Sequence, residues 1–231
     1  MFELDRLEIT QEGFSLTADW SVAKGQKIAI IGPSGGGKTT LLSAIAGFVA
    51  PACGDILLDG VSMSKLAPGK RPVSLLFQSH NLFPHLSVFQ NVGLGLRADL
   101  KLSPPQQDAV HVALAEVGLK EKAAQKPANL SGGQAQRAAL ARVLLRKKPL
   151  LLLDEPFAAL GPALKVEMLD LVDKIVARTG STLLMVTHDP ADAKRITDLT
   201  VLVDGGVAQR PVATDALFAN PPAALSRYLG T

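Results

Sequence analysis

The 231-residue sequence has little cysteine, no long apolar run and no leader-like start. Cys53 is its only cysteine, which excludes an internal disulfide and favours a reducing compartment. The nearest candidate for a membrane span, residues 41–53, contains Gly47 and Pro51 and is shorter than the roughly 18 apolar residues that a spanning helix needs. The N-terminus lacks the basic-then-apolar pattern of a secretion signal. We therefore expect neither a signal peptide nor a transmembrane segment.

The sequence also has little net charge. Its 24 Lys and Arg against 21 Asp and Glu leave a formal charge of +3, so nucleic-acid binding through bulk electrostatics is not expected. The densest basic run, residues 146–148, ends a helical pattern, where cations suit the negative end of the helix dipole. Hydrophobic residues make up 47% of the chain, which excludes disorder. A mean hydropathy of +0.23 then predicts either a large core or an apolar surface kept for a partner.

The apolar pattern alternates between strand and helix periods over most of the chain. Strands are predicted as a pair within 1–20 and then at 27–31, 54–58, 73–77, 150–153, 182–187 and 200–203. Helices are predicted at 38–46, 87–97, 103–117, 133–147, 162–178 and 190–196. Continuous apolar strands that alternate with helices indicate an α/β fold with a mainly parallel sheet covered on both faces.

The order of these elements predicts one domain with an insertion. Strand patterns stop near residue 79 and return near 149, so we expect a core from 1–78 and 149–231 and a mainly helical subdomain at about 79–148. Ser87 and Ser103 are predicted N-caps of the first two inserted helices. The last 25 or so residues predict a short helical tail in two pieces, divided by a Pro-Pro pair.

A glycine-rich turn lies between the strand at 27–31 and the following helix. Residues 32–39 match G-x-x-x-x-G-K-[ST] in the strand–turn–helix context that a phosphate-binding loop requires. Its backbone N–H groups and the helix dipole would face phosphate oxygens, Lys38 would reach the β- and γ-phosphates, and the Thr39 hydroxyl would ligate Mg²⁺. The alternative is a loop that only turns the chain. The predicted nucleotide contacts are Gly32, Pro33, Ser34, Gly35, Gly36, Gly37, Lys38, Thr39 and Thr40.

Two acids follow the apolar strand at 150–153. Asp154 and Glu155 should lie near the phosphates, because ligands bind beyond the carboxyl ends of parallel strands. Asp154 is a candidate Mg²⁺ ligand, usually through water, and Glu155 is close enough to polarise an attacking water. The alternative is a strand that ends in a solvated acidic turn.

A second glycine motif, Leu130-Ser-Gly-Gly-Gln134, begins the helical pattern at 133–147. It predicts another anion site at a helix N-terminus, although Ser131 could be an ordinary N-cap. With this motif in place, residues 1–215 resemble the ATP-binding cassette family, the ATPase subunits of ABC transporters. The resemblance implies a P-loop NTPase cassette with an N-terminal antiparallel β portion, with ATP and Mg²⁺ as cofactors. It also implies a homodimer that binds ATP at its interface. Ser131, Gly132, Gly133 and Gln134 would contact the γ-phosphate of ATP held by the partner.

Two further positions match the family. Gln78, after the strand at 73–77, resembles the glutamine that ligates Mg²⁺ and senses the attacking water. His188, after the strand at 182–187, resembles the switch histidine that contacts the γ-phosphate. The resemblance thus implies Glu155, His188 and Gln78 as catalytic residues, and Thr39, Gln78 and Asp154 as metal ligands.

Two positions depart from the family. Gly161 stands where an Asp normally helps to link the two sites of the dimer, which puts their coordination in doubt. Gln11 stands where an aromatic side chain is expected to stack on adenine. Phe14 and Trp20 are the nearest aromatic residues, and we expect a core role for both.

Residues 71–96 resemble bacterial importer cassettes, most closely those that energise the uptake of thiamine or thiamine phosphates. This implies a peripheral subunit on the cytoplasmic face of the bacterial inner membrane, docked on integral-membrane permease subunits and served indirectly by a periplasmic solute-binding protein. An end at residue 231, without a regulatory domain, favours such a short cassette. The apolar residues predicted to meet the permease are Leu82, Phe83, Leu86, Val88 and Phe89. The alternatives are an iron, polyamine or sulfate importer, a non-transport cassette that acts as a switch, and a regulatory subunit without turnover.

Overall fold

The structure is a computed structural model that describes residues 1–231 except 12, 78–81, 159 and 230–231. Its central element is a mixed β-sheet. Within the described residues the sheet has 11 strands in the order β5-β4-β1-β2-β10-β9-β3-β8-β7-β6, with β11 paired to β9. The strands are β1 (Phe2–Gln11), β2 (Phe14–Val22), β3 (Lys27–Ile31), β4 (Cys53–Leu58), β5 (Val61–Ser62), β6 (Val73–Leu76), β7 (Leu150–Asp154), β8 (Thr182–Val186), β9 (Leu199–Asp204), β10 (Val207–Ala208) and β11 (Val212–Ala213).

The sheet has a parallel and an antiparallel part. β9, β3, β8, β7 and β6 are parallel neighbours, which confirms the predicted parallel core. β1 pairs antiparallel with β2 and β4, as expected for an N-terminal antiparallel portion. The sheet therefore joins the carboxyl ends of five parallel strands at one edge, where ligands bind in such folds.

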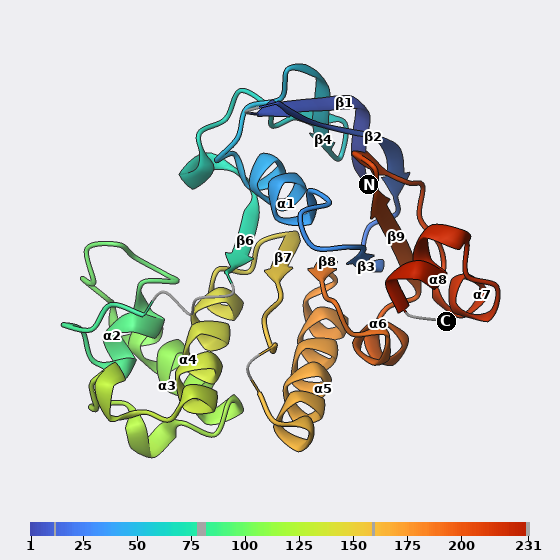
Figure 1. The fold of residues 1–231 in the computed structure, drawn as a ribbon. Helices are drawn as coiled ribbons and strands as arrows, with labels where there is room; N and C mark the ends of the chain where they lie inside the picture. The colour runs from blue at the N-terminus through green and yellow to red at the C-terminus, as the bar shows by residue number, and fades with distance from the viewer. Residues whose placement is uncertain (12, 78–81, 159, 230–231) are drawn as a thin grey trace.

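The helices cover both faces of the parallel strands (Figure 1). They are α1 (Lys38–Ala46), α2 (Val88–Gly93), α3 (Pro104–Glu116), α4 (Gly132–Leu145), α5 (Pro162–Thr179), α6 (Pro190–Ile196), α7 (Thr214–Ala219) and α8 (Ala223–Leu229), with single 3₁₀ turns at Pro68–Lys70, Lys120–Lys122 and Pro127–Asn129. The first four residues of β7 are leucines because both faces of this strand are buried. Leu150 and Leu152 pack in the cluster that includes α1, whereas Leu151 and Leu153 pack in the cluster that includes α4 and α5.

Helices α2, α3 and α4 share a core of their own, which includes Val88, Leu114 and Ala141. Ser87 caps α2 as predicted, since its Oγ accepts from Gln90 N at 3.1 Å and its N–H donates to Gln90 Oε1 at 2.8 Å. The predicted helix at 87–97 is too long, because α2 ends at Gly93. A Cβ on Gly95 would lie 2.3 Å from the carbonyl oxygen of Arg142, so the chain approaches α4 closely there and leaves the helix.

The C-terminal tail forms α7 and α8, separated by the Pro-Pro pair as predicted. Both helices pack against α6 and the sheet through a small apolar cluster. Over the described residues, no helix has both the length and the apolarity that crossing a membrane requires.

Candidate nucleotide site

The glycine-rich turn joins β3 to α1 and depends on its glycines. Gly32 has φ +147° and a Cβ there would lie 2.0 Å from the carbonyl oxygen of Val203 on β9. Gly37 has φ +103° and a Cβ would lie 2.7 Å from the ring of Phe14. The Gly36 N–H donates to the Pro33 carbonyl at 3.1 Å, which closes the turn. Side chains would therefore push this backbone away from its neighbours, and the loop could not keep its shape.

Lys38, the first residue of α1, is held by the loop itself. Its Nζ donates to the carbonyl oxygens of Gly32 at 2.8 Å and Pro33 at 2.9 Å. Only 7% of the residue is exposed, and this burial lowers the pKa of Lys38 against the opposing effect of Glu155 and Asp154. A buried ammonium without a full counter-charge gains most from an arriving anion, so the residue is prepared for phosphate.

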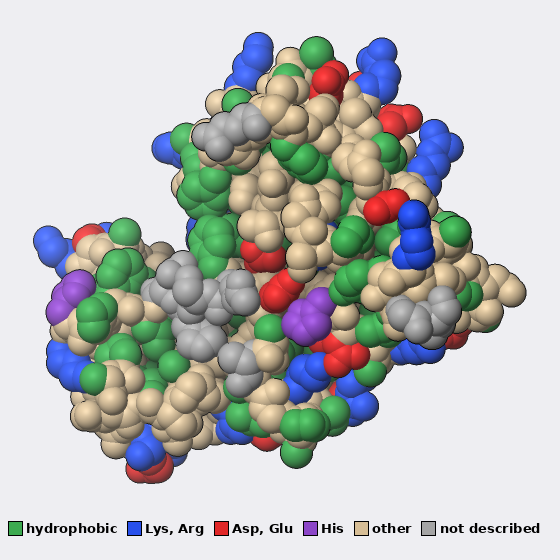
Figure 2. Space-filling view, in the orientation of Figure 1, with side chains coloured by type: hydrophobic (Ala, Val, Ile, Leu, Met, Phe, Trp, Pro, Cys, Tyr) green, Lys and Arg blue, Asp and Glu red, His purple; other side chains and the backbone are tan. Residues whose placement is uncertain are grey.

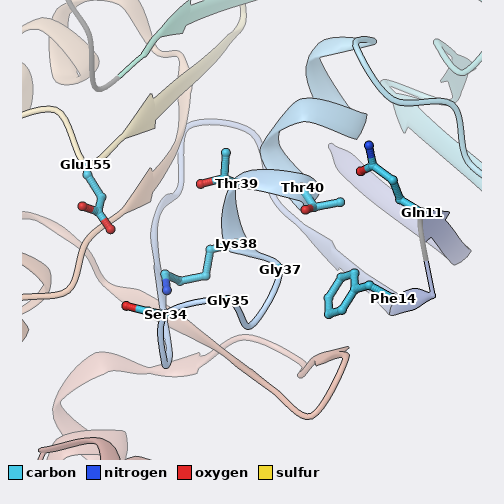
Figure 3. A pocket seen from close by; sticks show the side chains of 9 residues that line it. All are labelled: Gln11, Phe14, Ser34, Gly35, Gly37, Lys38, Thr39, Thr40 and Glu155. Carbon is cyan, nitrogen blue, oxygen red and sulfur yellow. The ribbon is translucent and has the colours of Figure 1, made fainter.

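The turn opens onto a pocket of about 620 Å³. It is lined by Gln11, Phe14, Ser34, Gly35, Gly37, Lys38, Thr39, Thr40 and Glu155 (Figure 3). Glu155 lies on one side of the turn, and Phe14 and Gln11 lie on the other. The prediction of a core role is confirmed for Trp20, which is buried and packs edge-on against Phe2. For Phe14 it is incomplete, because this partly buried ring also faces the pocket, where an aromatic face can stack on a base.

Asp154 lies at the end of β7, directly opposite α1. Thr39 Oγ1 donates to its Oδ1 at 3.3 Å, and only 8% of the residue is exposed. Burial raises the pKa of Asp154, with a smaller contribution from Glu155 and against the hydrogen bond of Thr39.

These oxygens fit a magnesium ion. Mg²⁺ in nucleotide sites takes one or two protein oxygens and fills the rest of its shell with phosphates and water. Thr39 and Asp154 offer such a pair, and a cation would remove the cost of the buried carboxylate. Among the described residues, no group of three or more His, Cys, Asp or Glu could hold a metal without further ligands. Gln78 lies outside the described residues.

Glu155 has a left-handed backbone with φ +44°, which is uncommon for a residue that is not glycine. Its N–H donates to the Val186 carbonyl on β8 at 3.1 Å, so the neighbouring strand holds this conformation. The Glu155 Oε2 lies 3.5 Å from His188 Nδ1. The structure thus brings Glu155 and His188 together, and local strain of this kind is common at functional sites.

The residues on both sides of His188 make polar side-chain contacts that the sequence did not predict. Thr187 Oγ1 donates to Asp192 Oδ2 at 2.8 Å, and Lys165 on α5 contacts both Asp189 and Asp192. The hydrogen bond from Lys165 lowers the pKa of Asp189. Tyr228 on α8 donates its hydroxyl to the His188 carbonyl at 3.0 Å. The elements that meet here are distant in sequence, so no local pattern could have revealed them.

The second glycine motif begins α4. Ser131 N donates to Gln134 Oε1 at 3.0 Å, and Gln134 N donates to Ser131 Oγ at 3.3 Å, so Ser131 does cap the helix. Ser131 and Gly132 are exposed, whereas a Cβ on Gly133 would lie 2.4 Å from Leu164 Cδ2. Of the described residues, none from 130–134 lines the pocket around Lys38. The two glycine motifs therefore do not meet in one chain.

Gly161 is the N-cap of α5, with φ −64° and Pro162 at the first helical position. A Cβ there would meet nothing within 4 Å, so glycine is not required by packing. The prediction that Val88 meets a permease is wrong, because this side chain is buried in the core between α2, α3 and α4. Its place in the amphipathic α2 turns it inward.

A family model described as ABC transporter matches residues 16–158. The chain belongs to the ABC transporter family. The cassette is 58% identical over 230 residues, all of both chains, to the thiamine import ATP-binding protein ThiQ of Cereibacter sphaeroides. It is 53% identical, also over the full length of both, to ThiQ of Ruegeria sp..

Solved structures agree with this assignment. One is a dimeric ATP-binding cassette in a post-hydrolysis state, bound to ADP and Pi. The cassette matches it with a TM-score of 0.81 and 27% identity, over 93% of this chain and 99% of that chain. The expected ABC cassette fold is therefore confirmed, and with it an ATP-binding, ATP-hydrolysing subunit.

Proposed function

We propose that this ABC ATPase energises the import of thiamine as a homodimer docked on the cytoplasmic face of a membrane permease. The assignment of thiamine as the solute is supported by the full-length identity of 58% and 53% to two thiamine import proteins. A cassette does not touch the solute, so this part rests on relatives and not on the pocket. The observation that carries the chemistry is the pocket itself, which unites the phosphate-binding turn with Glu155.

In this proposal the reaction is phosphoryl transfer to water, and the residues position and neutralise charge. Backbone N–H groups from the turn bind the phosphates, and Lys38 exchanges its two loop carbonyls for β- and γ-phosphate oxygens. Thr39 and Asp154 would hold Mg²⁺, which supplies further neutralisation of those oxygens.

Glu155 and His188 would act at the γ-phosphate. The Glu155 carboxylate reaches the pocket and would orient the attacking water and accept its proton. His188, 3.5 Å away, would donate to the γ-phosphate and keep Glu155 in place. We also assign Gln78 to this group, as a Mg²⁺ ligand and sensor of the attacking water.

The site would be completed by a second copy of the chain. Ser131, Gly132, Gly133 and Gln134 form a helix start that is separate from the pocket and is exposed at Ser131 and Gly132, so we assign it to the γ-phosphate of a partner's ATP. The dimeric form of the related cassette supports this arrangement.

The permease would dock on apolar surface near α2 and the end of α1. Phe83 is 46% exposed and Phe48 is 58% exposed, and the Phe48 ring packs on that of Phe77 at 5.7 Å. Figure 2 shows hydrophobic side chains gathered over the helical region and over the neighbouring part of the core. Exposed aromatic residues of this size are typical of a surface that is covered by a partner. A periplasmic solute-binding protein would deliver thiamine to the other side of the permease.

Two measurements test the proposal. The variant Glu155→Gln should bind ATP as tightly as the wild type, but its rate of ATP hydrolysis should be lower by about 100-fold or more. Glu121→Gln, an exposed acid outside the site, is the matched control. A normal rate in Glu155→Gln would contradict the catalytic role of this residue.

For the solute, the cassette should be purified with its permease, placed in vesicles and assayed for uptake of labelled thiamine that depends on MgATP. Glu155→Gln should stop this uptake. Transport of iron, a polyamine or sulfate in place of thiamine would contradict the proposed solute but not the proposed mechanism of ATP hydrolysis.

A further inference from the structure

The C-terminal helices lie directly beside the loop that carries His188 (Figure 1). Leu217 on α7 and Leu225 on α8 are buried in a cluster with Ala29 and Ile31 of β3 and Ala193 of α6. Lys194 of α6 lies over the Phe218 ring, 5.0 Å from its centroid. The two helices are therefore fixed to the strand that precedes the phosphate-binding turn and to the helix that follows His188.

Tyr228 extends from α8 to the backbone of His188. Its Oη donates to the His188 carbonyl oxygen at 3.0 Å, across 40 residues of sequence. Partial burial raises the pKa of Tyr228, with further contributions from the carboxylates of Glu155 and Asp189. The phenol therefore remains a proton donor at neutral pH, and it lies close to the acid assigned to the attacking water.

His188 needs such a contact because its side chain has little support. The side chain is 55% exposed, and its ring nitrogen Nδ1 lies 3.5 Å from Glu155 Oε2. Thr187 and Asp189, on either side, are tied to Asp192 and Lys165. Tyr228 adds a bond at His188 itself, from an element that takes no other part in the site.

We propose that Tyr228 is a positioning residue for ATP hydrolysis, which holds the His188 loop so that the imidazole faces Glu155. The bond fixes the peptide that follows the His188 Cα, and with it the direction of the side chain toward the pocket. The C-terminal helix α8 is thereby coupled to the reaction centre, although Tyr228 is not among the residues that line the pocket. This inference rests on the roles proposed above for His188 and Glu155.

The test is Tyr228→Phe, which keeps the ring and its packing and removes only the hydroxyl. Loss of one hydrogen bond that positions a catalytic group should lower kcat about three- to tenfold, with KM for MgATP changed less than about twofold. The matched control is Ser226→Ala, which removes a hydroxyl of the same helix that bonds to the Pro221 carbonyl at 3.4 Å. The control should keep the wild-type kcat, and both variants should keep the wild-type melting temperature.

A second readout follows His188 directly. The chain has four histidines, so labelled imidazoles give few signals in an NMR spectrum. In Tyr228→Phe the signal of His188 should shift, while those of His85 and His111 stay in place. An unchanged kcat with an unchanged His188 signal would overturn the inference. So would an equal loss of kcat in Ser226→Ala, because the effect would then belong to helix packing.

The variant His188→Ala separates this inference from the function on which it rests. Its kcat should be strongly reduced, and adding Tyr228→Phe should cause no further loss, since both changes act on the same group. A further loss in the double variant would show that Tyr228 acts independently of His188 and would overturn the inference alone. A wild-type rate in His188→Ala would remove the role of His188 itself and so contradict the proposed function.

Discussion

The two glycine-rich turns of this chain look alike in sequence but differ in what surrounds them. The first, at Gly32–Thr39, is enclosed by its own chain and lines a pocket of about 620 Å³ that Glu155 also reaches. The second, at Ser131–Gln134, starts a helix on the surface, and of the described residues none from this turn lines that pocket. Both present N–H groups at a helix start, yet only the first has an acid, a lysine and a hydroxyl around it.

This difference explains why one chain is half of a site. The first turn lies beside Glu155 and carries Lys38, whereas the second offers backbone donors, the Ser131 hydroxyl and the Gln134 amide. A helix start without neighbouring charges binds an anion weakly unless something else holds the anion. The proposed homodimer provides this, because the nucleotide held by one copy would meet the second turn of the other.

The largest expected effect is a loss of MgATP affinity when the first turn loses its lysine. Lys38→Ala removes the ammonium that now bonds to Gly32 and Pro33, and with it at least two charge-assisted contacts to phosphate. Affinity for MgATP should fall by about 100-fold or more, measured by titration calorimetry. Lys120→Ala, an exposed lysine far from the pocket, should bind normally. Normal binding by Lys38→Ala would show that the pocket is not where phosphate binds.

The next effect breaks the second turn. Ser131→Arg places a bulky side chain at the exposed helix start, so the isolated chain should bind ATP with unchanged affinity but fail to hydrolyse it. Mixing this variant with Lys38→Ala should then restore activity, because mixed dimers contain one site in which both turns are intact. Random mixing should recover about a quarter of the wild-type rate if the two sites act independently. No recovery, in a mixture shown to form mixed dimers, would mean that the turns do not act across an interface or that a single intact site is insufficient.

A smaller effect concerns Asp154, the buried acid at the end of β7 that accepts a hydrogen bond from Thr39 of the first turn. Burial raises the pKa of Asp154, so its ionised form destabilises the ligand-free fold, and its contribution to stability falls as pH rises through the folded pKa. Asp154→Asn should therefore stabilise the ligand-free chain at pH 7, with a smaller gain at pH 4. The same variant should lose hydrolysis that depends on Mg²⁺. Urea unfolding at the two pH values measures the first effect, and a destabilised variant at pH 7 would contradict it.

The contrast between the two turns also marks how far sequence reasoning reaches. The strand, turn and helix from Lys27 to Ala46 were predicted with correct boundaries, because apolar runs and glycine spacing are local signals. The early end of α2 was not predicted, since it depends on the contact of Gly95 with α4. The short strands β5, β10 and β11 are two residues each and leave no periodic pattern.

Within the site, the same limit applies to supporting contacts. Lys38, Thr39, Asp154 and Glu155 could be chosen from motifs, and the structure brings them together. Lys165 and Tyr228 reach the His188 loop from other elements, and their sequence neighbours give no sign of it. The division of the chain at about 79–148 remains a prediction, because a subdomain boundary is a statement about independent motion.

The smallest expected effect concerns Gly161, where the family normally carries an Asp that helps to link the two nucleotide sites of the dimer. The residue has φ −64°, and a Cβ added to it would meet nothing within 4 Å, so a side chain can start here without backbone strain. Gly161→Asp restores the residue that the family normally carries and adds an N-cap side chain to α5, which should stabilise the chain by a few tenths of a kcal/mol. If this position links the two sites, the ATP dependence of hydrolysis should become steeper in the variant, while kcat changes less than about twofold. Gly161→Ala is the control that adds a side chain without a carboxylate. An unchanged ATP dependence in Gly161→Asp would show that position 161 does not coordinate the two sites of the proposed dimer. Each pair of turns would then act as a separate site.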